Sequence, residues 1–533
     1  MTAVLPTTEP QPGTVAGPPR DTRARAVLVL ALVLTALYAA QLIVNVCRPQ
    51  QTTEPTVGIL SHDYPEQLHA TFWAVVGGWV LAAVLAPVAL AAVRAAADPR
   101  ERARRRHRWQ LGLAATLVAP YAMYPLFTLG QHMEYAVACV PSTVFALWTV
   151  HRMQRHRRMP VRLLLAVFAW GALIGGGFGA SMNIWVMDSV IGYAPVSLNM
   201  LKTMHTVYSC AFLSAGISEE LGKGAGVAIA YLLFRRYFDN VVSGIVLGAA
   251  AGLGFNFCES VEYMSNSNGL GAGFQYFSRQ SVGLMAAHTA FSAAVGAGFG
   301  IARQLADPRR RRLAIGCGYV AAAGGHFAND ALLRYFGQHP WARNPGQWMQ
   351  VGLITPGQLL ALQGPFVLLY LWLLRSGLRD QRSALGVELD AEARSGHGAV
   401  TLREVPALLS PARRLRKRVD ALRRGGADAY RELGRLYAAQ LDLGMQLWHR
   451  SRGESDPWAV PEPELRRRVL LMKHARLVPY LPVGNIPPQA PPPGPPQGPG
   501  APPGPPPGGP PPPPPQPPAR PPYPPQYPVQ VTP

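Results

Sequence analysis

The chain has 533 residues, of which 49% are hydrophobic, and a formal net charge of +21. Apolar runs of about 20 residues recur from residue 26 to residue 376, and each is long enough to cross a hydrocarbon core of about 30 Å. We therefore predict an all-α, polytopic bundle of transmembrane helices in a lipid bilayer. We expect no nucleic-acid partner, because the basic residues cluster in short loops between the apolar runs. The five cysteines form no C-x-x-C pair, which argues against a zinc knuckle or a disulfide framework.

The N-terminal residues 1–25 are polar and contain proline, and we expect them to be a disordered tail. The first apolar run follows three arginines, as a signal peptide would, but its length of about 21 residues exceeds the roughly 7–15 of a signal-peptide core. We interpret it as a retained span. The sequence predicts ten spans in all, at about residues 26–46, 70–93, 110–128, 135–150, 163–187, 211–234, 240–261, 283–302, 313–333 and 351–375.

The charge of the loops predicts the orientation. Alternate loops, beginning with residues 94–108, contain 19 arginines in total, whereas the loops between them contain 5 basic residues. Positive loops favour the cytoplasmic side, so we expect both termini to be cytoplasmic. The richness in Ala, Arg, Gly and Pro indicates GC-rich coding, and we expect a multi-pass protein of a bacterial plasma membrane.

The part after the last span differs in composition from the rest. Residues 376–480 are charged, with apolar residues at spacings of three and four, which predicts a cytoplasmic helical segment. Residues 481–533 are rich in proline and cannot form a packed core, so we expect a disordered tail. A solvated tail is the simpler interpretation, and a docking site for a cytoplasmic partner is the alternative. The spans divide at residue 210 into an N-terminal group, 26–210, and a group that carries the intramembrane charges, 211–375.

The sixth span contains three ionisable residues, Glu219, Glu220 and Lys223. Each charged side chain at the centre of a membrane helix costs about 2.5–3.5 kcal/mol on insertion scales. Glu219 and Lys223 are four residues apart, and Glu220 and Lys223 three apart, so both pairs can interact along one helix. A neutralised polar patch that joins helices would need only one such pair, and a second carboxylate remains. We therefore predict a functional site here.

The next three spans add polar residues at a similar depth. Glu259 lies late in the seventh span, His288 early in the eighth, and His326, Asn329 and Asp330 late in the ninth. Because consecutive spans run in opposite directions, all of these positions fall toward the outer face. Residues that form one site must lie at the same depth in the membrane, so this common position indicates a shared site. His326 lies one helical turn from Asn329 and Asp330, on the same face of the helix.

Two kinds of chemistry fit these residues. A glutamate could act as a general base with a histidine as the oxyanion donor. Alternatively, histidine and glutamate could bind a metal that lowers the pKa of a water. A proton-coupled transporter is a third reading, since intramembrane Glu and His also form proton relays, but the halves show no inverted repeat. A scaffold without activity is a fourth.

The motifs resemble those of the PrsW family of intramembrane proteases. The stretch "EELGK" is similar to the family's E-E-x-x-K motif, and "FNFCE", Phe255 to Glu259, is similar to its F-x-x-x-E motif. His288 with its following small residues, and "HFAND" from His326, look like the two histidine motifs. The wider superfamily includes the CAAX prenyl endopeptidases and the bacterial Abi proteins. The resemblance covers residues 211–333.

The resemblance implies proteolysis of a membrane-embedded or membrane-proximal substrate, such as a single-span anti-sigma factor. It implies Glu219 and Glu220 as base and support, Glu259 and His288 as groups that hold water or metal, and His326 as oxyanion donor or metal ligand. Zn²⁺ is the expected metal, with a metal-free mechanism as the alternative. Lys223, Asn329 and Asp330 would have supporting roles. Glu262 and Asp188 are expected to be surface residues.

Overall fold

The computed structural model describes residues 22–47, 65–193, 200–267, 269–337, 346–453 and 459–477. The expected N-terminal tail lies outside these ranges except for its last residues, which are helical, because α1 begins at Arg23. The proline-rich segment 481–533 also lies outside them. Residues up to Leu477 form one compact unit.

The described residues form helices and no strand, which confirms the all-α prediction. The α-helices up to the last expected span are α1 (Arg23–Val46), α2 (Glu66–Arg94), α3 (Pro99–Val118), α4 (Met123–Gln131), α5 (Met133–Met153), α6 (Val161–Ala169), α7 (Gly176–Tyr193), α8 (Met200–Leu233), α9 (Val241–Ser265), α10 (Leu270–Tyr276), α11 (Ala287–Gln304), α12 (Pro308–Gly337), α14 (Gln347–Met349) and α15 (Thr355–Arg394). Short 3-10 or π turns join or extend them at Ala119–Ala122, Trp170–Gly175, Arg235–Tyr237, Phe277–Val282 and Gln350–Ile354.

Eight helical stretches of the described residues are long and apolar enough to cross a membrane. They are Arg23–Val46, Glu66–Arg94, Pro99–Gln131, Met133–Met153, Val161–Tyr193, Val241–Ser265, Leu270–Gln304 and Gln350–Arg394. Each contains one of the ten predicted spans. The other two predicted spans lie in α8, which carries Glu219, Glu220 and Lys223, and in α12, which carries His326 and Asp330. α8 has 34 residues and is about 51 Å long at 1.5 Å per residue.

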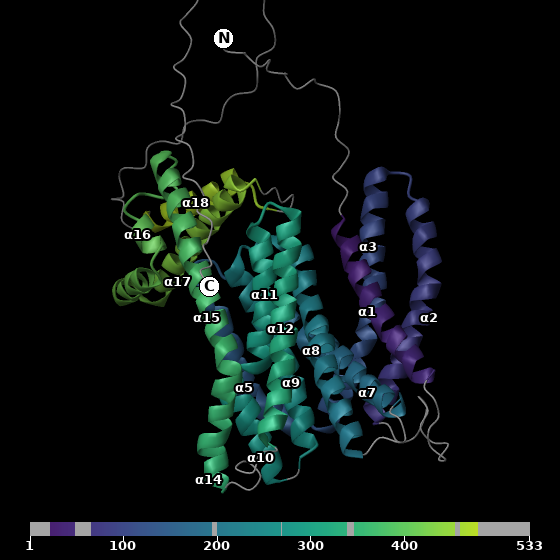
Figure 1. Cartoon of the computed structure of the whole chain (residues 1–533). Helices are drawn as coiled ribbons and strands as arrows, with labels where there is room; N and C mark the ends of the chain where they lie inside the picture. The colour runs from purple at the N-terminus through teal and green to yellow at the C-terminus, as the bar shows by residue number, and fades with distance from the viewer. Residues whose placement is uncertain are drawn as a thin grey trace, which may run out of the picture. The chain divides into compact units, whose positions relative to one another are not determined.

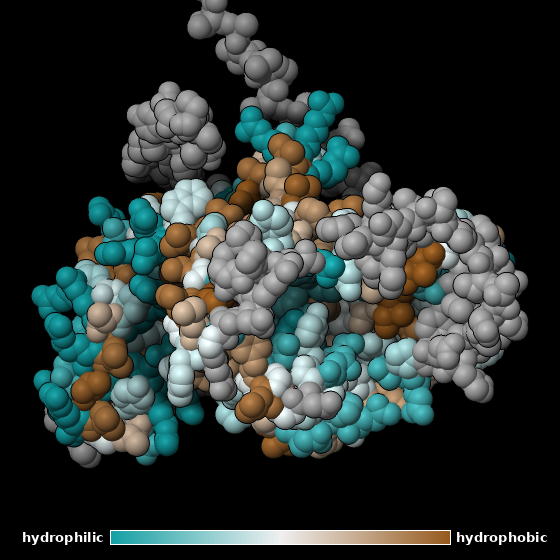
Figure 2. All heavy atoms as spheres, turned by 60° about the horizontal axis from the view of Figure 1, so that its bottom comes forward, coloured by the Kyte–Doolittle hydropathy of each residue, from teal (hydrophilic) through white to brown (hydrophobic). Residues whose placement is uncertain are grey.

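The helix α9 is buried along most of its length and packs against α11 and α8, while α12 packs against the same two helices (Figure 1). Nearly every side chain of α9 from Val241 to Asn256 is buried, whereas α1 and α2 expose many leucines and valines. Figure 2, which brings the lower end of the view forward, shows hydrophobic side chains on the outer surface between hydrophilic ones. An apolar exterior around a buried helix is the arrangement that a lipid environment favours.

Glycines bring α9 and α11 close together. A Cβ added at Gly248 would collide with the backbone carbonyl of Ser292, and one added at Gly252 would collide with that of His288. Gly244 and Gly296 contact each other's carbonyls in the same way. The small-residue repeats therefore permit backbone contact between the two helices. This contact determines how close His288 on α11 lies to Glu259 on α9.

The charged C-terminal segment is helical, as the sequence predicts, but it does not begin with a break near residue 376. Instead, α15 continues from the last expected span to Arg394. Its extension packs with α16 (Val405–Leu408), α17 (Pro411–Ser451) and α18 (Glu462–Leu477) around a core that includes Leu385, Leu389 and Leu443. We call residues 380–477 the C-terminal helical module.

Candidate active site

The predicted polar residues come together from four helices. We define the arginine-rich end of the bundle as the end that holds the turn at Arg235–Tyr237 and the turn before Pro308. Glu259 and His326 each lie 18 residues beyond the first residue of α9 and α12, or about 27 Å from this end at 1.5 Å per residue. His288 is the second residue of α11, which runs toward the same end. The sequence-predicted residues therefore share one depth, near the opposite end.

Glu220 and Lys223 form the innermost pair of the site. Lys223 is fully buried, and its Nζ lies 2.5 Å from Glu220 Oε1. The hydroxyl of Ser292 donates to Glu220 Oε2 at 3.0 Å, so both carboxylate oxygens are occupied. The Lys223 ammonium also lies 4.0 Å from the centroid of the Phe255 ring, a favourable cation–π distance. This pair holds α8 against α9 and α11.

Among the described residues, Glu219 accepts a hydrogen bond through one of its carboxylate oxygens only. The amide of Asn183 on α7 donates to Glu219 Oε1 at 2.8 Å. The hydroxyls of Ser214 and Ser218 both donate to Asn183 Oδ1, which directs its NH₂ group toward the glutamate. The other oxygen, Oε2, is buried without a hydrogen bond among the described residues. Lys223 Nζ and His326 Nε2 lie 3.5 and 3.6 Å from this oxygen, respectively.

Each histidine has one ring nitrogen against a carboxylate. His326 Nδ1 lies 3.2 Å from Glu220 Oε1, and His288 Nε2 lies 2.6 Å from Glu259 Oε2. A proton on each of these nitrogens would leave His326 Nε2 and His288 Nδ1 as acceptors facing the centre of the site. A carboxylate behind a histidine fixes the tautomer and raises the basicity of the inner nitrogen. Both histidines thus have the support that metal-binding or proton-accepting imidazoles have.

Glu259 has a second partner besides His288, a cation that the sequence did not reveal. Arg279 follows α10 in the turn at Phe277–Val282, and its Nη1 lies 2.9 Å from Glu259 Oε2. Its guanidinium also stacks on Tyr263, 3.6 Å from the ring centroid. The sequence places Arg279 in a loop between two spans, whereas in the structure its side chain enters the site.

Glu219, His288 and His326 could hold a metal ion. One donor atom of each lies within 4.8 Å of the others, and all three residues are buried. The prediction from the resemblance named Glu259 with the two histidines, but the structure places Glu259 behind His288 and Glu219 at the centre. The donor set, with its unbonded Glu219 Oε2 and two carboxylate-supported imidazoles, fits a divalent ion. Lys223 Nζ lies 3.2 Å from His288 Nδ1, so metal binding would displace this contact.

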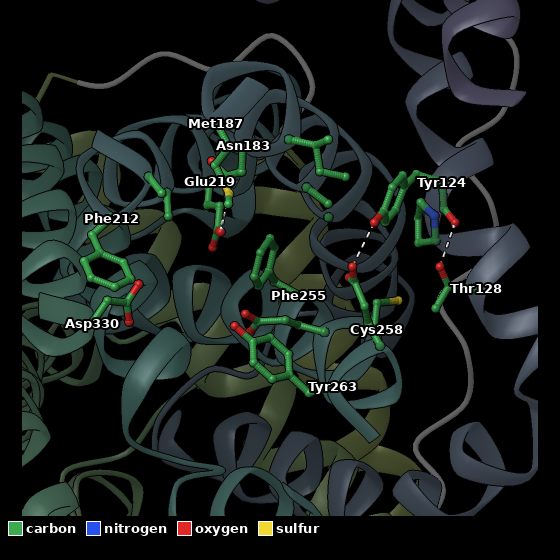
Figure 3. Close-up of a pocket in the computed structure, with 18 of the residues that line it drawn as sticks. Tyr124, Thr128, Asn183, Met187, Phe212, Glu219, Phe255, Cys258, Tyr263 and Asp330 are labelled. Atoms are coloured by element: carbon green, nitrogen blue, oxygen red, sulfur yellow. Dashed lines mark hydrogen bonds between the residues drawn. The ribbon is translucent and has the colours of Figure 1, made fainter. Parts of the chain in front are cut away.

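A cavity of about 530 Å³ opens beside these groups. Glu219, Glu259 and Asp330 line it together with apolar side chains of α7 and α8, among them Met187 and Phe212. Figure 3 shows that Glu219 and Asp330 face this space from different helices. The cavity has the size of a small-molecule or peptide-segment pocket. It gives water and an extended chain access to Glu219.

Two sequence interpretations are wrong here. Glu262 is not a surface residue, because it lines the cavity and accepts a hydrogen bond of 2.8 Å from the Tyr124 hydroxyl. Asp188 is half-buried and accepts a hydrogen bond of 2.8 Å from Asn45. Both partners come from N-terminal helices, more than 130 positions away in the sequence.

Asp330 and Asn329 occupy the rim of the site. Asp330 Oδ2 lies 3.5 Å from His326 Nε2, as the four-residue spacing predicts. Asn329 donates to Asp330 Oδ1 at 3.0 Å and accepts a hydrogen bond of 3.1 Å from Gln363 of α15. Asn329 therefore links α12 to α15.

Asn183, Arg279, Ser292 and Gln363 are the site residues that the sequence analysis missed. Asn183 carried the clearest signal, since it is an amide in the middle of an otherwise apolar run, and polar residues within membrane helices are costly and usually functional. Ser292 and Gln363 carried no comparable signal, because isolated serines and glutamines are common in such helices.

One of the three comparisons with known proteins found a match. Residues 159–354 match the model of the PrsW family of intramembrane metalloproteases. No curated protein and no solved structure matches the chain. The matched region begins before α6 and ends where α15 starts, and it contains every residue predicted for the site. The match and the apolar helices together support a multi-pass membrane protein with an intramembrane protease region.

Proposed function

We propose that this protein is an intramembrane endopeptidase that hydrolyses a peptide bond of a single-span membrane protein. The observation that carries the proposal is the buried group of Glu219, His288 and His326, whose donor atoms lie within 4.8 Å of one another beside a cavity of about 530 Å³. The family match supports the same reaction class. The alternative, a transporter with a proton relay, would not require a carboxylate and two imidazoles to converge on one point.

The reaction can be assigned to atoms of this chain. Water in the cavity gives a proton to Glu219 Oε2 while its oxygen attacks the substrate carbonyl carbon, and the proton then passes to the departing amine as the C–N bond breaks. In this step His326 carries a proton on both ring nitrogens, so that Nδ1 donates to Glu220 and Nε2 donates to the oxyanion. Asn183 orients the base, and Glu259 with Arg279 orients His288.

The same residues fit a metal ion such as Zn²⁺. Glu219, His288 and His326 would hold it, and a bound metal would lower the pKa of a water to near neutrality. Glu219 would then be a ligand rather than the base. In both cases the substitution Glu219→Gln removes the required carboxylate.

The depth of the site in the membrane indicates where the substrate would be cut. The site lies about 27 Å from the arginine-rich end along α9 and α12, which is close to the full thickness of a bilayer core of about 30 Å. If the arginine-rich end is cytoplasmic, cleavage takes place near the outer membrane face. An anti-sigma factor is one substrate class that would use such a cut.

The test uses purified full-length protein in lipid nanodiscs with a single-span reporter substrate. We expect wild type to release a fragment and Glu219→Gln to release none. Glu134→Gln, which changes an exposed carboxylate at the start of α5, should cleave as wild type does. Equal cleavage by Glu219→Gln and wild type would refute the proposal. The metal content of wild type, compared with that of the variants His288→Ala and His326→Ala, distinguishes the mechanism with a metal ion from the one without.

A further inference from the structure

A second cavity lies at the arginine-rich end, between the ends of the membrane helices and the C-terminal helical module. Its volume is about 370 Å³. Among the described residues, Asp442 is the one carboxylate that lines it. Five arginines line it, namely Arg157, Arg158, Arg236, Arg303 and Arg468. This excess of positive charge has no role in the proposed reaction, which lies at the other end of the bundle.

Two of these arginines have partners near the cavity. Arg303 Nε donates to the Phe238 carbonyl at 3.1 Å, and Arg468 Nε lies 2.9 Å from Glu464 Oε1.

A third arginine, Arg157, joins the two parts of the chain. Arg157 Nη1 lies 3.0 Å from Asp239 Oδ1 in the turn between α8 and α9, and its Nε lies 3.0 Å from Asp442 Oδ1 on α17. His449 on α17 also contacts Asp239, at 2.8 Å. The charge of Arg157 is therefore balanced within the chain, and this network attaches the module to the membrane helices.

Arg158 and Arg236 are different, because neither forms an ion pair with a carboxylate among the described residues. Both side chains are exposed to solvent, and the charges of Arg152 and Arg418 lie near that of Arg158. Arg236 stacks on the ring of Tyr237, 4.7 Å from its centroid. Cations that gather without a carboxylate create a positive potential that an anion would relieve. A guanidinium group matches the geometry of phosphate oxygens in particular.

The rest of the wall indicates an organic group attached to the anion. Pro160, Val460 and Leu465 line the cavity beside the arginines. Arg158 lies three residues before α6, and Arg236 three residues after the last residue of α8, so both lie where membrane helices end. A ligand with a phosphate and an adjoining apolar or neutral part would complement both surfaces.

We propose that this cavity is a binding site for a phosphate ester, with the phosphate between Arg158 and Arg236. Two sources present this chemistry: the headgroup of an anionic phospholipid entering from the bilayer surface, or a soluble nucleotide. Because the wall contains residues of the membrane helices and of α17 and α18, the bound ligand links the module to the bundle.

The experiment compares full-length wild type with the double variant Arg158→Gln/Arg236→Gln in a phosphate-free maltoside detergent. The control is Arg309→Gln/Arg310→Gln, which removes two exposed arginines outside the cavity. Phosphatidylglycerol is titrated with native mass spectrometry as the readout, and ADP is titrated in parallel by calorimetry. We expect one of the two probes to bind once per chain in wild type and control, and at least ten-fold more weakly in the double variant.

The result also shows whether the bound phosphate ester is a lipid or a soluble nucleotide. Binding of phosphatidylglycerol alone indicates a lipid site, and binding of ADP alone indicates a nucleotide site. Leu465→Trp fills the apolar part of the cavity without changing the charge and should also weaken binding. It tests the proposal independently if the double variant does not fold. The proposal is wrong if neither probe binds saturably, or if the control loses as much affinity as the double variant.

Discussion

The side-chain amide of Asn183 holds one oxygen of Glu219 at 2.8 Å, and the other oxygen faces Lys223 and His326 at 3.5 and 3.6 Å without a hydrogen bond from the described residues. Two serine hydroxyls on α8 fix the direction of that amide. A residue of α7 thus determines which oxygen of the α8 glutamate faces the site. The geometry of the candidate site therefore depends on a helix that carries none of the recognised motifs.

Replacement of Asn183 should therefore impair catalysis without unfolding the protein. We expect Asn183→Leu to lower kcat by about 10- to 100-fold, the usual cost of losing a residue that orients a ligand or base, while the substrate KM stays nearly constant. Ser214→Ala removes only one of the two donors to Asn183 and should cost much less. Reporter cleavage in nanodiscs measures both, and a large rise in KM with unchanged kcat would contradict the positioning role.

Lys223 should matter for folding as well as for activity. Lys223→Met leaves Glu220 buried without its cation, and breaking a buried pair in this way costs about 3–5 kcal/mol. The double variant Lys223→Met/Glu220→Gln also removes the charge of Glu220 and should be more stable than Lys223→Met alone. Apparent Tm values of the purified variants give the comparison. A Tm of Lys223→Met equal to that of wild type would mean that the pair adds nothing to stability.

Glycine contacts should set the distance between α9 and α11. In Gly248→Ala the new methyl group meets the Ser292 carbonyl, so α11 must move outward, which we expect to cost about 1–3 kcal/mol and to displace His288. Gly324→Ala is the matched control, since nothing lies within 4 Å of a Cβ at that position, and alanine is favoured over glycine in a helix by up to about 1 kcal/mol. The two variants should shift the apparent Tm in opposite directions.

The loop between α5 and α6 should make the module sensitive to acid. His156 is buried, and burial followed by the charge of Arg414 lowers its pKa to about 4. The unfolded chain takes up this proton near its usual pKa of about 6.5, so stability falls as the pH drops from about 6.5 toward 4. The full loss is roughly 3 kcal/mol for a shift of this size.

The variant His156→Gln should remove this pH dependence, because glutamine takes up no proton. We expect its apparent Tm to change less between pH 7.5 and pH 5 than that of wild type. His474→Gln, in an exposed position on α18, should leave the wild-type dependence in place. Identical pH profiles for His156→Gln and wild type would show that another group is responsible.

Much of the fold could be predicted because the signals are local. Apolar runs of about 20 residues and alternating loop charge require no knowledge of tertiary contacts. The grouping of Glu219, Glu259, His288 and His326 followed from depth alone, since helices that run in opposite directions place their residues at levels that can be counted.

The features that could not be predicted from the sequence depend on the rotation of each helix about its axis and on contacts between distant segments. Whether Glu259 or Glu219 faces the centre depends on how α9 and α8 are rotated about their axes, which spacing along one helix does not determine. Arg279 looked like a loop residue, but the turn after α10 folds back into the bundle. Glu262 looked exposed because its partner, Tyr124, lies 138 positions earlier.

The position of the cut is the last prediction. Glu259 and His326 lie about 27 Å from the arginine-rich end, measured at 1.5 Å per residue along their helices, and the cavity beside them is lined by charged groups that water can hydrate. Proteolysis needs both water and an extended substrate segment, and a membrane helix frays most easily near its ends. We therefore expect cleavage of a single-span substrate at or just outside the membrane boundary opposite the arginine-rich end. Mass spectrometry of the new terminus locates the cut, and a reporter fused after Arg382 gives the orientation independently. A cytoplasmic reporter signal together with a cut in the cytoplasmic juxtamembrane segment would show that the site has been assigned to the wrong end of the bundle.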